Sequence, residues 1–470
     1  MNICIRKLAV AAVVLALTGP GYAFEPPEPW YVFVDVNVLP MSGPVVLTHQ
    51  TVLVRGGRIA AVAPADKITL TPDVVRIDGR GKYLMPGLSD MHAHITPSEP
   101  PGTTAELLLY LASGVTTLRN MAGFPGHLPL RQAIKDGAVL GPRLYTTSPL
   151  LEGEDAVWDF SVKVLNAEEA RTRVREYAQQ GWDFIKVYHT LSAEAYAAVI
   201  EEARAQGIRV VGHVPFTVGI EEVLADGQSS VEHLRGYDID GLSPDVLAIG
   251  GGRSPQRFAS WLSMSDERMA DLARQTAHAG TWNTPTLVVN MMLADFETLP
   301  EMAKHPMAVY LTPEMLGMLE ENPLEKIFSP ESRAMLGRVL PQQYKFIKAL
   351  HDAGAPLMIG TDTFPSLVPG FTVIDEIDHF VKAGLSPYDA LFAATVAPSV
   401  YLGQTSADGT VTAGQETDLI LLDANPLEDT NNLWQLEGVM VHGRWLLKSE
   451  LLSMITAELL RAASKPAPTQ

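Results

Sequence analysis

Short runs of hydrophobic residues alternate with longer amphipathic stretches through the middle of the chain. The amphipathic stretches carry helix-start signals, such as Asn166 with Glu169 three residues later and Ser386 followed by Pro387. Parallel strands buried on both faces have continuous apolar sequences, so the alternation predicts strands connected by helices. Eight runs have this character, at residues 85–95, 115–118, 143–147, 184–188, 209–214, 230–234, 284–289 and 357–362. Eight is the number of strands that closes a (β/α)8 TIM barrel, which is the α/β fold expected here.

The two ends of the chain have a different, strand-rich pattern. Val32, Val34, Val36 and Val38 alternate with other residues, a Gly-Gly pair at 56–57 marks a hairpin turn, and similar apolar strands return at 418–422 and 438–441. We therefore expect a small β-sandwich domain built from residues 24–83 and 400–448. It would flank a barrel over 84–399, and a helix and tail would follow at 449–470. Long connections at 235–269 and 290–333 are candidate lids, and the second is rich in methionine, which suits an apolar lid but is better explained by core packing of helices.

The first 23 residues have the composition of a signal peptide. Arg6 and Lys7 precede an apolar run at 8–17, and small residues end the segment at Ala23. Because the run is far shorter than the ~20 residues that span a bilayer, no stable membrane anchor is expected. The sequence predicts an exported protein, periplasmic or secreted. The only cysteine, Cys4, lies inside the signal peptide, which excludes disulfides and cysteine-bound metals in the mature chain.

The charge of the chain excludes some partners. The formal net charge is −19, and removal of the two cationic signal residues makes it −21. Nucleic acid and anionic membranes are therefore not expected to bind, and a small molecule is the expected partner. The sequence leaves the oligomeric state open, a homo-oligomer included.

Ionisable residues recur where the predicted strands end. His92 and His94 lie two residues apart near the end of the first run, so a strand would turn both imidazoles to the same side. Further candidates end later runs: Lys186, His213, His233 and Asp362. Taken singly, a histidine is more often a half-buried packing residue, and Asp362 could be a turn or helix cap. Together they indicate a metal site, because the carboxyl ends of barrel strands share one mouth.

The types of these residues limit the metal chemistry. Imidazole and carboxylate without sulfur suit zinc, with manganese, cobalt and iron(II) as alternatives. Four histidines and an aspartate exceed the three protein ligands of a usual catalytic zinc, which favours two divalent ions. Lys186 lies between apolar neighbours, where an ammonium is costly, so it must pair, lose its proton or be modified. Carboxylation by CO2 would turn it into a bridging anion, a carbamate.

Several motifs resemble those of the amidohydrolase superfamily. They are Gly57-Arg58-Ile59, the segment 81–88 that leads into His92-Ala93-His94, the glycine-led strand 114–117, and the closing segment 414–419. The chain is similar to the imidazolonepropionase-like branch, which includes metal-dependent, prolidase-like dipeptidases. The resemblance implies that His92, His94 and Asp362 hold one ion and that His213 and His233 hold the other. Carboxylated Lys186 and a hydroxide would bridge the ions, and Asp362 would transfer protons during hydrolysis of an amide bond.

The chain also departs from that pattern. The branch usually has Arg-Asp after its second strand, where this chain has Arg119-Asn120, and the segment after His213 lacks the tyrosine of the peptidases. Tyr188 and His189 are candidate oxyanion donors or ordinary loop residues. Trp158 and Phe160 are candidates to line an apolar mouth.

Two other functions stay open at this point. The same site could act on a lactone, a carboxylic ester or a phosphotriester. A protein of another class, which binds a metal or ligand without catalysis on a hydrolase scaffold, is the remaining alternative.

Overall fold

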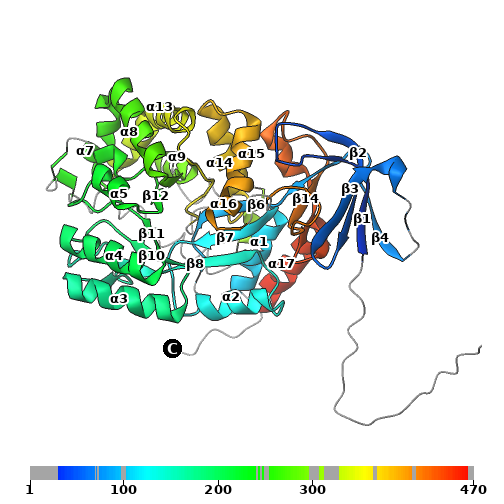
Figure 1. The fold of residues 1–470 in the computed structure, drawn as a ribbon, viewed down its shortest axis with the longest axis horizontal. Coiled ribbons are helices and arrows are strands. Elements are labelled where there is room, and N and C mark those ends of the chain that lie inside the picture. The colour runs from blue at the N-terminus through cyan, green and yellow to red at the C-terminus, as the bar shows by residue number, and fades with distance from the viewer. Residues whose placement is uncertain are drawn as a thin grey trace, which may run out of the picture.

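The computed structural model describes residues 30–68, 70, 73–96, 102–239, 242–243, 246–247, 253–295, 306–311, 328–363, 368–404 and 409–463. The predicted signal peptide lies outside these residues. Within them the chain forms two eight-stranded sheets, one surrounded by helices and one near the chain ends (Figure 1). None of the helices in these ranges has the length and apolar character needed to cross a membrane.

The first sheet is a barrel of parallel strands. Its neighbours follow the chain order: β6 (Leu88–Ala93), β7 (Val115–Asn120), β8 (Arg143–Glu152), β10 (Phe184–Val187), β11 (Arg209–Gly212), β12 (Ser230–Glu232) and β13 (Trp282–Thr284), with β9 (Val162–Lys163) beside β8. The eighth segment, 357–363, bridges Asn283 of β13 at Leu357 and Ala93 of β6 at Thr363. Because this segment joins both edge strands, the predicted eight-membered barrel is confirmed.

The predicted bounds of two strands were wrong, because each predicted run contains a strand and a second element. The run 85–95 divides at Gly87: β5 (Tyr83–Pro86) joins the other sheet and β6 starts the barrel. A side chain at Gly87 would collide with Thr116 of β7, so the glycine lets the two strands pass closely. The run 284–289 ends as a strand at Thr284, and helix α9 (Leu287–Asp295) follows. Glu376 accepts hydrogen bonds from the N–H groups of Leu287 and Val288, which stabilises this helix start.

The second sheet joins both ends of the chain. Its order is β16 (Arg444–Leu447), β15 (Leu436–Val441), β14 (Leu419–Leu422), β5, β1 (Trp30–Val38), β2 (Leu47–Arg55) and β3 (Arg58–Pro64), and β4 (Val74–Asp78) pairs with β1. Although three strands separate β1 from β16, the rings of Phe33 and Trp445 lie 5.3 Å apart, and Ile59 donates a hydrogen bond to Gln415. The sheet therefore curls over its own core as a sandwich, as expected, with the early and late strands together in Figure 1.

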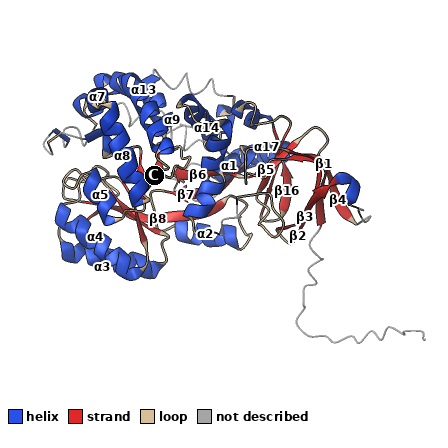
Figure 2. Cartoon of the chain, turned by 45° about the horizontal axis from the view of Figure 1, so that its top comes forward, coloured by secondary structure: helices blue, strands red, loops and turns tan. Residues whose placement is uncertain are grey.

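Helices surround the barrel strands (Figure 2). They are α1 (Gly102–Ala112), α2 (His127–Lys135), α3 (Ala167–Gln180), α4 (Ala193–Gln206), α5 (Ile220–Asp226), α7 (Pro255–Ser263), α8 (Asp266–Ala279), α9, α13 (Pro330–Asp352), α14 (Thr372–Lys382), α15 (Pro387–Ala394) and α16 (Val396–Tyr401). The expected caps are present, since Asn166 and Ser386 accept the N–H groups of Glu169 and Asp389. The last helix, α17 (Lys448–Ala463), packs against α1 and the second sheet.

The two long connections, at 235–269 and 290–333, are described to different extents by the structure. The first contains α7 and the start of α8, which follow β12 on the barrel. Much of the second lies outside the described residues, including Met302, Met315 and Met318. In the described part, Met292 and Met307 pack against hydrophobic clusters, which favours core packing for these two methionines.

Candidate metal centre and active site

One pocket lies at the mouth of the barrel, and all six predicted site residues line it. The pocket has a volume of about 280 Å³. His92 and His94 come from the end of β6, Lys186 from β10, and Asp362 from the closing segment. His213 and His233 directly follow β11 and β12. The strand ends of a parallel barrel therefore bring together residues that are up to 270 positions apart in the chain.

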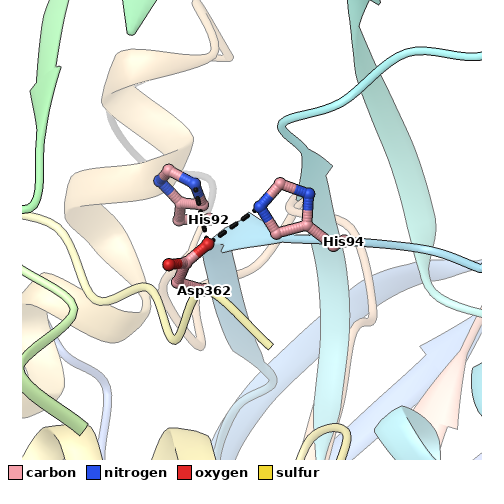
Figure 3. A group of neighbouring side chains, drawn as sticks. All are labelled: His92, His94 and Asp362. Carbon is pink, nitrogen blue, oxygen red and sulfur yellow. Dashed lines mark hydrogen bonds and ion pairs between the residues drawn. The ribbon is translucent and has the colours of Figure 1, made fainter. Parts of the chain in front are cut away.

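His92, His94 and Asp362 form a compact group (Figure 3). Nε2 of His94 lies 2.8 Å from Oδ1 of Asp362, and Nε2 of His92 lies 3.4 Å from the same oxygen. One ligand atom from each residue falls within 4.8 Å of the others. Two imidazoles and one carboxylate at this spacing are a donor set that suits zinc and related divalent ions.

His213 and His233 lie beside this group. The ring of His233 is 4.5 Å from that of His92 and 4.8 Å from that of His213. Nδ1 of His233 lies 3.8 Å from Oδ2 of Asp362. The four histidines therefore form a continuous row, with Asp362 facing three of them.

The backbone is strained where this site is assembled. His233 and Asp362 have φ angles of 60° and 54°, a region that residues other than glycine rarely adopt. Gly360 lies where an added Cβ would stand 2.7 Å from the backbone nitrogen of His92 and would also collide with Thr284. A residue without a side chain at this point lets the closing segment approach β6 and brings Asp362 to His92.

Lys186 is buried in the floor of the pocket, with 1% of its surface exposed. Among the described residues, no carboxylate or carbonyl forms an ion pair or hydrogen bond with its Nζ atom. Burial lowers the pKa of this amine to about 8, although the charges of Glu232 and Asp362 oppose the shift. The lysine is therefore available for modification or for ligation at the centre of the site.

Burial favours the neutral form of three imidazoles, those of His92, His213 and His233, and this is the form that binds metals. Burial lowers the pKa of His92 to about 4, and it lowers the pKa values of His213 and His233 well below their ordinary range. Burial acts in the opposite sense on Asp362, but the neighbouring histidines outweigh it and hold the pKa of this carboxyl below its usual range.

A buried ion pair behind the site was missed by the sequence reasoning. Oε2 of Glu232 accepts a hydrogen bond from Nδ1 of His92 at 2.8 Å, and both oxygens accept from Nη2 of Arg119 at 3.0 Å. Arg119 is fully buried and also donates to the hydroxyls of Ser230 and Tyr401. A carboxylate that orients a metal-binding histidine is a common supporting device. The position of Glu232, directly before His233, was the available signal.

Asp90 is a second supporting carboxyl that was missed. It accepts the N–H of His92 at 3.1 Å, and the N–H and hydroxyl of Thr361 at 3.1 and 2.6 Å. These bonds connect the end of β6 to the closing segment, one residue before Asp362. Burial raises the pKa of Asp90 to about 7.

Asn120, which departs from the family pattern, and the two candidate oxyanion donors all lie among the described residues. The amide of Asn120 accepts the N–H of Ile95 and donates to Thr146, so it links strand ends without a charge. Tyr188 and His189 both line the pocket. The Tyr188 ring stacks on His213 at 4.0 Å, and Nε2 of His189 lies 3.1 Å from Nδ1 of His213. Their expected role as oxyanion donors stays a prediction.

A (β/α)8 barrel with imidazoles, a carboxylate and a buried lysine at its mouth defines the class of metal-dependent barrel hydrolases. The chain belongs to the Amidohydrolase family, whose sequence profile matches residues 83–446. Enzymes of this kind hydrolyse carbon–nitrogen bonds.

Individual relatives agree with this assignment. Ochratoxinase of Aspergillus niger is 23% identical over 408 residues, covering 74% of this chain and 72% of the relative. Imidazolonepropionase of Rubrobacter xylanophilus is 24% identical over 81% of this chain and 86% of its own length. The crystal structure of a putative prolidase from Bifidobacterium longum has a TM-score of 0.67 at 24% identity, covering 92% of this chain and all of that one. The resemblance to the imidazolonepropionase-like and prolidase-like branch is thereby confirmed.

Proposed function

We propose that the chain is an exported, binuclear metal-dependent amidohydrolase. Its substrate would be a small cyclic amide or dipeptide-like molecule. The observation that carries the proposal is the convergence of four histidines, Lys186 and Asp362 on one pocket. These donors exceed what one catalytic ion needs and contain no sulfur. Lactones, carboxylic esters and phosphotriesters are the competing substrates, since the same donors serve those reactions.

Each residue has a defined place in this proposal. His92, His94 and Asp362 would hold one ion, and His213 and His233 the other. Lys186, which forms no direct ion pair with a described carboxylate, would add CO2 through its unprotonated Nζ, forming a nitrogen–carbon bond and releasing a proton. Divalent ions held by these residues, with zinc expected, would supply hydroxide at neutral pH and would polarise the scissile carbonyl.

In this proposal Asp362 would move protons. Its Oδ1 atom faces His92 and His94, whereas its Oδ2 atom lies 3.8 Å from Nδ1 of His233. Oδ2 therefore has room to accept a proton from an attacking water and to deliver it to the leaving nitrogen. Proton transfer of this kind typically contributes a factor of about 10²–10⁴ to the rate.

The test uses the mature chain, reconstituted with zinc and bicarbonate. We expect two equivalents of bound metal by elemental analysis and turnover of amides or dipeptides in a substrate panel. Less than one equivalent of metal would overturn the binuclear proposal. Good turnover of esters or lactones with no turnover of any amide would overturn amide hydrolysis.

A further inference from the structure

The pocket extends beyond the six candidate ligands into a region of different character. One side is aromatic: Phe160 lies between Phe124 and Trp158, with ring centroids 5.4 and 5.6 Å away. Two guanidinium groups, from Arg235 and Arg253, also line the pocket. A pocket with an apolar wall and a few convergent charges selects its ligand through those charges.

Two arginines, Arg235 and Arg257, share one aspartate behind this pocket. Both oxygens of Asp238 pair with Arg257, at 3.0 and 2.8 Å. Arg235 reaches the same carboxylate only at 3.8 Å, and its buried Nε atom has no hydrogen-bond partner among the described residues. The side chain of Arg235 is 14% exposed. A mostly buried cation with so weak a counterion is costly, and an anionic ligand would remove that cost.

Arg253 adds a second positive charge at the same place. Its guanidinium lies over the rings of Trp158 and Phe328, at 5.3 and 5.6 Å, and forms no ion pair with a described carboxylate. The nearby carboxylate of Glu152 is already bonded to Ser161 and to the loop amide of Val157. The aromatic rings orient Arg253 but do not neutralise it.

The pocket offers little to bind a cation outside the metal ligands. Glu106 is the other acid that lines it, and this carboxyl accepts the N–H of Thr96. The lining outside the metal ligands therefore has two guanidinium groups and one carboxyl that is already bonded. An ammonium group in this part of the pocket would be repelled.

We infer that Arg235, assisted by Arg253, binds a carboxylate of the substrate, and that the substrate is an N-acylated amino acid. Its carboxylate would lie against Arg235, which is two residues after His233, and an aromatic or other large apolar acyl group would lie against Trp158 and Phe160. A dipeptide with a free amino terminus would be a poorer substrate. This inference rests on the proposed amide hydrolysis and narrows it to one class of amide.

Matched substrates test the inference in the wild-type chain loaded with zinc. They are an N-benzoyl amino acid, the same compound with its carboxylate converted to a carboxamide, and a dipeptide of similar size with a free ammonium. We expect kcat/KM at the benzoyl bond to be about 30-fold or more higher for the carboxylate, because loss of a desolvated charge partner typically has this effect. Equal rates for the carboxylate and the carboxamide, or a preference for the free dipeptide, would overturn the inference.

Variants identify the residue responsible. Arg235→Met should raise KM for the carboxylate substrate about 30-fold or more and leave the carboxamide within threefold, and Arg235→Lys should restore part of the loss. Arg253→Met should act in the same direction, which keeps the test valid if Arg235→Met does not fold. Arg274→Met, at a 66% exposed arginine, is the matched control. Equal effects on both substrates would overturn the inference while amide hydrolysis stands, whereas failure of the wild type on every amide would overturn both.

Discussion

The Nδ1 atom of His92 lies 2.8 Å from Oε2 of Glu232, and Glu232 in turn pairs with the buried guanidinium of Arg119. Because the carboxylate accepts a hydrogen bond from Nδ1, the Nδ1 atom carries the proton. The Nε2 atom of His92, which lies toward Asp362, keeps its lone pair for a metal ion. Glu232 thus determines which imidazole nitrogen of His92 is presented to the candidate metal centre. Its energetic role and its chemical role are separable by experiment.

Glu232→Gln should weaken both the metal centre and the fold. The amide is uncharged, and its NH2 group cannot accept a hydrogen bond where a carboxylate oxygen now accepts from Arg119, so the side chain should shift and metal affinity should fall about 10–100-fold. A buried Arg119 without its counterion should lower the free energy of unfolding by about 3–5 kcal/mol. Competition with a chelator measures the first quantity, and urea unfolding measures the second.

The control for this variant is Glu201→Gln, which removes an exposed ion pair with Arg171. Pairs of this kind contribute about 0–1 kcal/mol, and this one joins α3 to α4 at exposed positions. Wild-type metal affinity in Glu232→Gln would show that Glu232 does not orient His92.

The contrast between Glu232 and His233 explains what the sequence could and could not predict. His233 was found because apolar runs predict strands, and the carboxyl ends of barrel strands meet at one mouth. Glu232 is adjacent in the chain but points behind the site, toward Arg119 of a strand 113 positions earlier. No periodicity encodes that pairing. The division of the run 85–95 at Gly87 was hidden for the same reason, because it depends on the approach of Thr116 from a neighbouring strand.

Lys186→Ala tests the bridging anion. If a carbamate on Lys186 joins two ions, the variant should lose at least one equivalent of metal and most of its activity. Short carboxylic acids such as acetate or propionate should restore part of both by occupying the space. Elemental analysis and amide turnover check these outcomes, with Lys163→Ala at an exposed lysine as the control. Full activity in Lys186→Ala would exclude this lysine as a bridge.

Glu376 should make stability depend on pH near neutrality. Burial raises the pKa of this carboxyl from about 4.5 to about 8, against the hydrogen bonds from Val288 and Leu287. The folded chain therefore binds a proton that the unfolded chain has released, and the free energy of unfolding should fall as the pH rises from about 4.5 to about 8. Each unit of pKa difference corresponds to about 1.4 kcal/mol.

Urea unfolding between pH 5 and pH 8.5 measures this dependence. Glu376→Gln cannot titrate, so its stability should decline less steeply with pH than that of the wild type, whatever its absolute value. An unchanged slope would show that Glu376 is ionised in the folded chain. Asp375→Asn is the matched comparison on the same helix, because burial raises the pKa of Asp375 only to about 6.

Glu152 should control substrate binding through the loop that carries Trp158. At the end of β8, its Oε2 atom accepts the hydroxyl of Ser161 at 2.6 Å and the N–H of Val157 at 3.0 Å. Both bonds stabilise the loop that holds the aromatic wall of the pocket. In Glu152→Ala this loop should loosen, and KM should rise about tenfold while kcat changes less than threefold, because hydrogen bonds to a charged group are each worth about 1.5–3 kcal/mol.

Steady-state kinetics on the best amide measures the separate changes in KM and kcat, and Glu154→Ala, at an exposed neighbour, is the control. A fall in kcat with unchanged KM would contradict this role, because it would place Glu152 in the chemical step.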